Sequence, residues 1–370
     1  MHLLRFFIVY LPAKCGKLIL SMDTRIVAIN ESNIDEHLVA EAGNIIKDGG
    51  LVAFPTETVY GLGGDALNPE SSSKIYAAKG RPSDNPLIVH IAEFEDLQKI
   101  VEEVPEQAKK LADRFWPGPL TMIFRKSDIV PTTTTGGLDT VAVRMPVHKT
   151  ALAFIKAAGG YVAAPSANIS GRPSPTTAKY VIEDMDGRID MIIDGGDSGI
   201  GLESTIVDLT GEKPMILRPG YITEAMLADA LGEVAVDPTI MDGNCKDRPK
   251  APGMRYRHYA PKGELTIVTG DSEKVVSFIN SQAGQAQAIG RKVGVIGTDE
   301  NLGRYRADSV KSVGSRADED QIAHRLYSIL REFDDEDMDV IFSESFDESN
   351  LGQAIMNRLL KAAGHQVIDL

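Results

Sequence analysis

The stretch KGRPSDNPLIVH, residues 79–90, joins a loop that carries two cations to a short apolar run. Its two prolines each remove a backbone N–H and disfavour helical geometry in the residue before them. The apolar residues 87–89 are typical of a buried strand. The sequence therefore predicts a stiff loop at the mouth of a strand, with Lys79 and Arg81 on that loop.

A lysine and an arginine one residue apart are well suited to holding an anion. Arginine offers a two-pronged donor and lysine a compact point charge, a combination that fits a phosphate or a carboxylate. A solvated surface turn can carry the same two residues, so this motif alone leaves both interpretations open.

The whole-chain composition limits the classes of function. The 370 residues are long for one domain and comfortable for two. With 39 basic and 53 acidic residues, the net charge is −14, which argues against a dedicated nucleic-acid binder but allows a local basic pocket. The chain has two cysteines, Cys15 and Cys245, so we expect neither a disulfide framework nor a cysteine-rich zinc site. We expect the protein to work in a reducing compartment.

The N-terminal segment, residues 1–22, does not fit the pattern of the rest. Its apolar run is interrupted by Pro12 and by lysines, and it is too short to span a membrane. It lacks a clean small-residue cleavage site. We expect residues 1–22 to be an N-terminal extension or the result of a mis-assigned start, with Met22 directly before the first strand.

Residues 23–236 alternate short apolar strands with helical patterns, which is typical of an α/β domain. Several strands end in polar or cationic residues, where open α/β sheets bind ligands. Residues 61–66 fit the dinucleotide pattern GxGxxA, but Asn68-Pro69 separates these glycines from the next helix. A dinucleotide site is therefore not favoured.

Residues 237–263 break this alternation, because they are rich in Pro and Gly and unusually basic for an acidic chain. We expect this linker to act as a lid over an anion, and a solvated tether is the alternative. Residues 264–370 again alternate strands and helices and predict a smaller Rossmann-like parallel α/β domain without a catalytic constellation. We expect its acidic run, residues 334–337, to be a solvated loop.

Eight motifs then occur in order along the chain: PTETVYGLGGDA, KGRPSDNPLIVH, WPGPLT, DTVAVRMP, APSANISGRPSPT, ESTIVDLT, LRPG and APGMRYRHYAP. Together they closely resemble the threonylcarbamoyl-AMP synthases in their long two-domain form, over residues 23–370. The resemblance implies a YrdC-like twisted mixed sheet around a wide concave, locally positive cavity. It also implies an enzyme that converts L-threonine, bicarbonate or CO2, and ATP into threonylcarbamoyl-AMP and pyrophosphate. Mg²⁺ would accompany ATP without ligands from protein side chains.

The resemblance assigns roles to individual residues. The signature residues of catalysis are Lys79, Arg81, Ser166 and Asn168. The residues around threonine are Thr58, His90, Arg144, Ala164 and Ser204, with Arg144 on the threonine carboxylate. The ATP contacts are Arg81, Asn85, Thr140, Ser166, Ser174 and Arg218, together with Tyr256 and His258 of the linker. For His90, a satisfied core histidine at a strand end stays open as an alternative.

The resemblance further implies a cytoplasmic nucleotidyltransferase of tRNA processing, with no membrane partner. Its product would pass to the machinery that forms N6-threonylcarbamoyladenosine at position 37 of tRNAs, and a weak tRNA contact is possible. One rival is an RNA- or ribosome-associated binding module that uses the same positive cavity. Another is a carbamoyl-transfer domain of the hydrogenase-maturation type, which would need acylphosphatase and zinc-finger segments that this sequence lacks.

Overall fold

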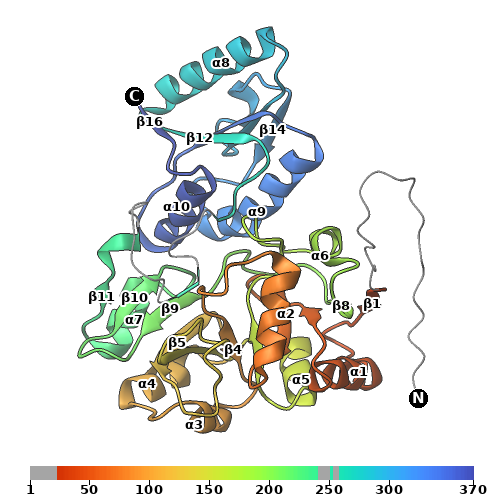
Figure 1. Cartoon of the computed structure of the whole chain (residues 1–370). Coiled ribbons are helices and arrows are strands. Elements are labelled where there is room, and N and C mark those ends of the chain that lie inside the picture. Colours follow the sequence, from red (N-terminus) through yellow and green to blue (C-terminus); the bar gives the residue numbers. More distant parts are fainter. Residues whose placement is uncertain (1–22, 241–250, 253–257) are drawn as a thin grey trace.

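The computed structural model describes residues 23–240, 251–252 and 258–370. It contains a large mixed sheet and a separate parallel sheet, each covered by helices (Figure 1). The predicted α/β class, with a mixed sheet followed by a smaller parallel domain, is confirmed. The predicted N-terminal extension and most of the predicted lid lie outside the described residues.

The first sheet has eleven strands in the order β1-β8-β2-β3-β7-β4-β6-β5-β9-β10-β11 and pairs them both parallel and antiparallel. These strands are β1 Arg25–Ala28, β2 Val52–Phe54, β3 Gly61–Asp65, β4 Ile88–His90, β5 Leu120–Arg125, β6 Thr140–Arg144, β7 Val162–Ala164, β8 Met191–Asp194, β9 Thr205–Asp208, β10 Met215–Arg218 and β11 Ala235–Val236. The helices of this part are α1 Glu36–Lys47, α2 Pro69–Lys79, α3 Leu97–Ile100, α4 Glu106–Phe115, α5 Lys149–Ala157, α6 Ala178–Met185 and α7 Glu224–Leu231.

The second sheet has five parallel strands in the order β14-β13-β15-β12-β16. Its strands are β12 Glu264–Thr269, β13 Val293–Gly297, β14 Ser309–Ser312, β15 Val340–Glu344 and β16 Val367–Asp369, and its helices are α8 Ser272–Ala288, α9 Glu319–Asp335 and α10 Asn350–Ala362. The sequence did not predict β14 and β16, which are short strands at the two edges of this sheet.

Two local signals set the backbone around the cationic loop. The strand β3 carries the glycines of the GxGxxA pattern, and α2 begins only at Pro69, so no helix opens at these glycines. Asn68 caps α2, because its side chain accepts from the N–H of Glu70. Gly80 ends α2 in the left-handed conformation, with φ at 61°, where glycine is favoured.

Two expectations about loops are wrong. Lys79 is the last residue of α2, the helix expected after Asn68-Pro69, so of the two cations Arg81 alone lies on the loop itself. The acidic run 334–337 is also not a solvated loop throughout, because α9 continues to Asp335. Asp334 is buried and its Oδ1 accepts from the backbone N–H of Lys262 at 2.6 Å. A local count of charges could not reveal this partner, which lies 72 residues away.

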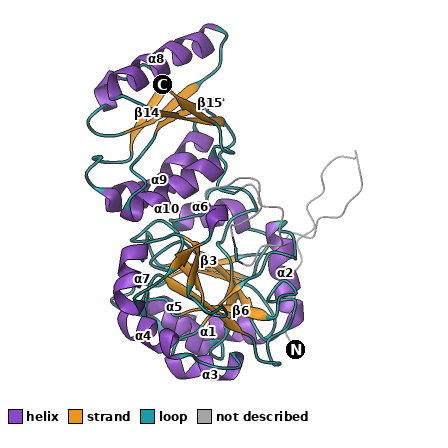
Figure 2. Cartoon of the chain, turned by 90° about the vertical axis from the view of Figure 1, so that its left-hand side faces the viewer, coloured by secondary structure: helices purple, strands orange, loops and turns teal. Residues whose placement is uncertain are grey.

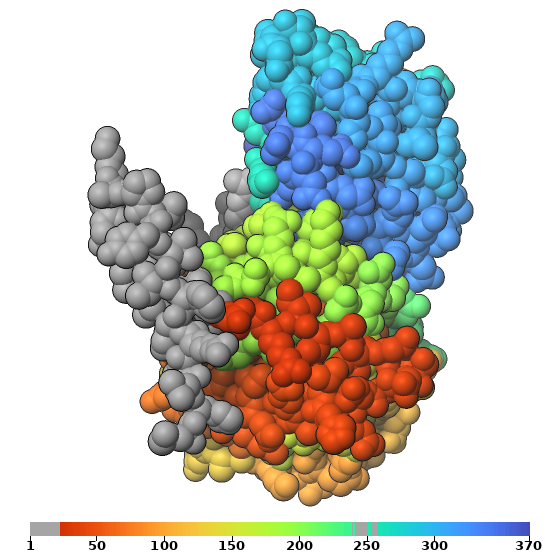
Figure 3. All heavy atoms as spheres, turned by 90° about the vertical axis from the view of Figure 1, so that its right-hand side faces the viewer, coloured from red at the N-terminus to blue at the C-terminus, as the bar shows by residue number. Residues whose placement is uncertain are grey.

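The helices α9 and α10 lie between the two sheets, and α8 covers the outer face of the parallel sheet (Figure 2). The segment around α6 lies directly against the C-terminal domain (Figure 3). There the exposed Lys179 of α6 donates to Asp335 of α9 at 2.6 Å. No helix among the described residues is long and apolar enough to cross a membrane.

Candidate active site

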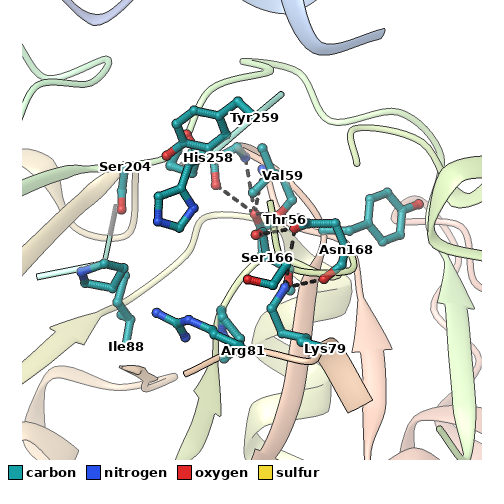
Figure 4. Close-up of a pocket in the computed structure, with 18 of the residues that line it drawn as sticks. Thr56, Val59, Lys79, Arg81, Ile88, Ser166, Asn168, Ser204, His258 and Tyr259 are labelled. Carbon is teal, nitrogen blue, oxygen red and sulfur yellow. Dashed lines mark hydrogen bonds between the residues drawn. The ribbon is translucent and has the colours of Figure 1, made fainter. Parts of the chain in front are cut away.

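One cavity on the mixed sheet collects most of the residues that the sequence analysis singled out. It lies beside α2, the strand ends of β4, β6, β7 and β10, and the segment that enters the C-terminal domain. The predicted residues that line it are Thr58, Lys79, Arg81, His90, Arg144, Ala164, Ser166, Asn168, Ser204, Arg218 and His258. In Figure 4, Lys79 and Arg81 project side by side from one wall, and His258 and Tyr259 enter from the opposite side.

Lys79 anchors the segment that carries two further signature residues, Ser166 and Asn168. Its Nζ donates to the backbone oxygens of Ser166 and Asn168, and it lies 3.4 Å from Oδ1 of Asn168. The hydroxyl of Ser166 donates to the same Oδ1 at 2.5 Å. Burial, and secondarily the charge of Arg81, lower the pKa of the Lys79 amine well below its ordinary value. Lys79, Ser166 and Asn168 therefore form one connected unit, with Arg81 beside it.

Arg81 is buried, with 8% of its surface exposed, and only part of its guanidinium is bonded within the described chain. Its Nη2 donates to the backbone oxygen of Pro86 at 3.0 Å, whereas Nη1 has no hydrogen-bond partner among the described residues. Burial lowers its pKa to about 10, so it stays charged at neutral pH. A buried cation with a donor to spare favours an anionic ligand.

A second cation, Arg144, ends β6 and is held from two sides. Its Nη1 donates to Oγ1 of Thr58 at 2.8 Å, and its Nη2 donates to Oε1 of Glu57 at 2.6 Å. The neighbouring strand places His90 directly opposite Arg144 in register. Burial and then the charge of Arg144 lower the pKa of His90 to about 3, so its ring is neutral. The ring also lies edge-on to Phe54, at 5.9 Å between centroids.

A third cation, Arg218, ends β10 on another side of the cavity. Its Nε donates to the backbone oxygen of Ser204 at 3.0 Å and its Nη2 to the hydroxyl of Ser204 at 3.2 Å. That hydroxyl also shares a 2.8 Å hydrogen bond with Thr121. Among the described residues that line the cavity, the carboxylate is Glu203. The three arginines and Lys79 outnumber this one carboxylate, so the cavity has a local positive charge in an acidic chain.

Three of the predicted nucleotide contacts do not line this cavity. Thr140 begins β6, at the opposite end from Arg144. Asn85 is buried, and its Oδ1 has no hydrogen-bond partner among the described residues. Ser174 is buried and donates to Oε1 of Glu203 at 2.6 Å. A fourth, Tyr256, lies outside the described residues. The roles of these four in nucleotide binding stay predictions, as does the lid.

The sequence analysis missed Glu57 and Glu203, which the structure joins to the predicted residues. Glu57 lies inside the first motif, between two threonines, and Glu203 directly precedes Ser204. Their positions next to predicted site residues were the available signal. Their ion-pair partners come from far along the chain, at separations of 87 and 155 residues, and no local pattern points to such partners.

The two parts of the chain match two known families. Residues 44–220 match the family described as "Telomere recombination", and residues 222–364 match the family described as "Threonylcarbamoyl-AMP synthase, C-terminal domain".

Whole proteins from other organisms are also similar to this chain. A protein of Pyrococcus abyssi named threonylcarbamoyl-AMP synthase is 49% identical over 347 residues, which cover 94% of this chain and 100% of the relative. A Bacillus subtilis protein of the same name is 48% identical over 340 residues, which cover 92% of this chain and 96% of the relative. The crystal structure of Pyrococcus abyssi Sua5 complexed with L-threonine superposes with a TM-score of 0.89 at 48% identity, covering 94% of this chain and 100% of that one.

Proposed function

The chain belongs to the threonylcarbamoyl-AMP synthase family, a family of enzymes, and from this premise we propose that it makes threonylcarbamoyl-AMP and pyrophosphate from L-threonine, bicarbonate or CO2, and ATP. The observation that carries the proposal is that separate buried cations meet on one cavity. Arg144 stands on one side of it, and Lys79, Arg81 and Arg218 stand on the others. This arrangement suits two substrates that each carry an anionic group, the carboxylate of L-threonine and the phosphates of ATP.

The threonine end of the cavity is proposed at Arg144. Its guanidinium is held by Glu57 and Thr58, so its orientation is set before a carboxylate arrives. The neutral ring of His90 adds a polar group without a second charge. Ala164 and Ser204 line the same cavity. The relative that was crystallised with L-threonine supports this choice of substrate.

We place the nucleotide end of the cavity at Arg81 and Arg218. Lys79 supports this end by binding the backbone oxygens of Ser166 and Asn168. The spare donor of Arg81 supports a phosphate contact. Lys79 fixes the segment of Ser166 and Asn168, which places the hydroxyl of Ser166 beside the cavity. His258 lies near Arg81, and its charged form is disfavoured by burial and by that arginine, which lower its pKa to about 3. Asn85, Thr140, Ser174 and Tyr256 are proposed as further contacts to the nucleotide.

The chemistry needs positioning and charge neutralisation rather than a covalent enzyme intermediate. After its ammonium has lost a proton, the threonine nitrogen forms a bond to the carbon of CO2, and a second proton leaves to give a carbamate. A carbamate oxygen then attacks the α-phosphorus of ATP. The bond to the β-phosphate breaks, and pyrophosphate leaves with the electron pair. Fixed cations stabilise charge on the transferring group, and holding both substrates lowers the entropic barrier.

Mg²⁺ is proposed to enter with ATP, where it would neutralise phosphate charge. The described residues contain no group of three or more His, Cys, Asp or Glu side chains placed to hold a metal ion. Glu203, the carboxylate at the cavity, is already bonded to Ser174 and Arg358. We propose that phosphate oxygens and water would hold this metal, and that Arg81 and Arg218 would contact the remaining phosphate oxygens.

The product is proposed to serve the formation of N6-threonylcarbamoyladenosine in tRNA, in the cytoplasm, by transfer to a separate enzyme system. A weak tRNA contact is compatible with this role. The second candidate, an RNA- or ribosome-associated binding module, would use the same positive cavity, but the net charge of −14 disfavours it.

The test is release of pyrophosphate from ATP by the full chain. We expect release to require both L-threonine and bicarbonate, and omission of either to return it to background. Pyrophosphate release at the same rate with and without L-threonine would contradict the proposal. Tight RNA binding without any pyrophosphate release would favour the binding module.

A further inference from the structure

A buried arginine of the C-terminal domain, Arg358 of α10, contacts the cavity wall. Its side chain is fully buried at 0% exposure. Its Nε donates to Oε2 of Glu203 at 3.0 Å, its Nη2 to the backbone oxygen of Glu203 at 3.3 Å, and its Nη1 to the backbone oxygen of Pro219 at 2.6 Å. One guanidinium thus holds two segments of the other domain.

The carboxylate of Glu203 is in turn shared between the two domains. Its Oε1 accepts from the hydroxyl of Ser174 at 2.6 Å, and its Oε2 accepts from Tyr327 of α9 at 2.9 Å. Burial opposes the charged form, but Arg358 and Arg218 outweigh it and lower the pKa of Glu203 to about 2. Glu203 is therefore a charged, fully engaged group at neutral pH.

The two segments that Arg358 holds continue directly into the cavity. Glu203 precedes Ser204, and Pro219 follows Arg218. Arg218 bridges these segments again, because it donates to both the backbone oxygen and the hydroxyl of Ser204. The distance between the two segments is thus set twice, once inside the cavity by Arg218 and once behind it by Arg358.

We propose that Arg358 is a positioning residue for the nucleotide side of the cavity, acting with Tyr327 through Glu203 on Ser174 and Arg218. The inference rests on the proposed use of ATP. It makes the C-terminal domain a structural part of the nucleotide site. The threonine side is expected to depend less on Arg358, because Arg144 is held by Glu57 and Thr58 within the first domain. Ser204 has its own anchor in Thr121.

The two domains also make contacts that do not involve Arg358. Arg331 of α9 forms a second buried interdomain pair, with its Nη2 at 2.5 Å from Oδ2 of Asp184, and it also donates to the backbone oxygen of Pro173. Apolar residues of both domains, including Val59 and Leu202, share one buried cluster with the C-terminal core. Apolar side chains in place of a buried ion pair often stabilise a contact between two domains as well as the ion pair does, or better. An arginine that donates to three acceptors at the cavity wall is therefore better explained by a role in positioning the segments of Glu203 and Pro219 than by docking alone.

The experiment measures binding of a non-hydrolysable ATP analogue and of L-threonine to the full chain. For Arg358→Lys, which keeps the charge but loses the fork, we expect about tenfold weaker binding of the analogue, as for the loss of one charge-assisted hydrogen bond. Binding of L-threonine should change less than about twofold. Lys179→Ala, which removes an exposed interdomain pair, is the matched control and should leave both affinities unchanged.

Further variants keep the test decisive if Arg358→Lys fails to fold. Arg358→Met combined with Glu203→Gln removes both buried charges at similar volume, and we expect it to fold and to bind the analogue weakly. Tyr327→Phe removes one hydroxyl, and we expect about threefold weaker analogue binding.

The inference is overturned if the folded variants bind the analogue with parental affinity. It is also overturned if the affinities for the analogue and for L-threonine fall by the same factor. If the parent binds the analogue but releases no pyrophosphate, the proposed function fails while the variants still decide the inference. If the parent does not bind the analogue, both are overturned.

Discussion

Arg144 and Glu57 lie 87 residues apart in the sequence and form a buried ion pair, with 2.6 Å between Nη2 and Oε1. The side chains are 5% and 11% exposed, so water screens the pair weakly. Thr58 holds the other terminal nitrogen of the same guanidinium. The proposed threonine carboxylate would thus meet an arginine whose orientation is already determined, which lowers the ordering cost of binding.

Arg144→Ala should weaken L-threonine binding by about 2–4 kcal/mol, because a charged hydrogen-bonding group at a desolvated site is lost. The apparent KM for ATP should change much less. Steady-state pyrophosphate release with each substrate varied in turn gives both values. Arg125→Ala, at the exposed end of β5, is the control and should leave both unchanged. Equal losses for threonine and ATP would remove Arg144 from the threonine end.

Lys79→Met should reduce turnover by about a hundredfold or more, since the segment of Ser166 and Asn168 loses its anchor beside the proposed nucleotide site. We also expect a loss of stability of about 1–3 kcal/mol, because buried carbonyl oxygens lose their donor. Urea unfolding and single-turnover assays measure the two effects separately. Lys74→Met, an exposed position on the same helix, should keep parental turnover. Parental turnover of folded Lys79→Met would contradict the assignment.

Gly201→Ala should destabilise the contact between the two domains. Gly201 has φ at 84°, and an added Cβ would lie 2.6 Å from Cα of His324 in α9. The left-handed backbone alone costs an alanine about 1–3 kcal/mol. Thermal unfolding should therefore begin at a lower temperature than in the parent. Gly199→Ala is the matched control, since an added Cβ there meets nothing within 4 Å. Indistinguishable melting of the two variants would show that α9 does not depend on this close approach.

Stability should fall as the pH drops below the ordinary pKa of histidine, partly because of His90. Its folded pKa is about 3, below the ordinary value of 6.5, so the unfolded chain binds more protons between these values. The contribution of His90 is therefore complete above pH 6.5 and is lost by up to about 1.4 kcal/mol per pH unit below it.

Urea unfolding of the parent and of His90→Gln at neutral and mildly acidic pH measures how much of the pH-dependent stability comes from His90. The variant should lose less stability on acidification than the parent does. His37→Gln, at an exposed position of α1, serves as the control and should follow the parent. A pH dependence that is the same in His90→Gln and the parent would contradict a neutral, buried His90.

Much of the fold follows from local signals in the sequence. The apolar residues 87–89 largely became strand β4, and the helix expected after Asn68-Pro69 is α2, which runs from Pro69 to Lys79. These signals act over one or two turns, so they can be recognised without knowing the fold. The edge strands β14 and β16 were missed because short strands at a sheet edge carry weak apolar patterns.

Most of the site residues that the ordered motifs predicted do line the cavity. The four basic residues of the cavity come from distant parts of the sequence. Lys79, Arg144 and Arg218 each end a helix or a strand, and Arg81 follows shortly after one. Such ends gather at one side of a sheet, which is why the four residues meet. What each group binds was not predictable. Lys79 donates to a loop and Arg144 pairs with Glu57, although the sequence presents both as free cations.

The sequence by itself therefore determined the two α/β units and the candidates for the site, because these depend on local periodicity and on recognisable motifs. The tertiary structure alone decided that Glu203 meets Arg358 and that Asp334 is buried beside Lys262, over separations of 155 and 72 residues. Such contacts leave no local pattern, since Glu203, Arg358 and Asp334 each resemble ordinary surface charges until the fold removes them from water.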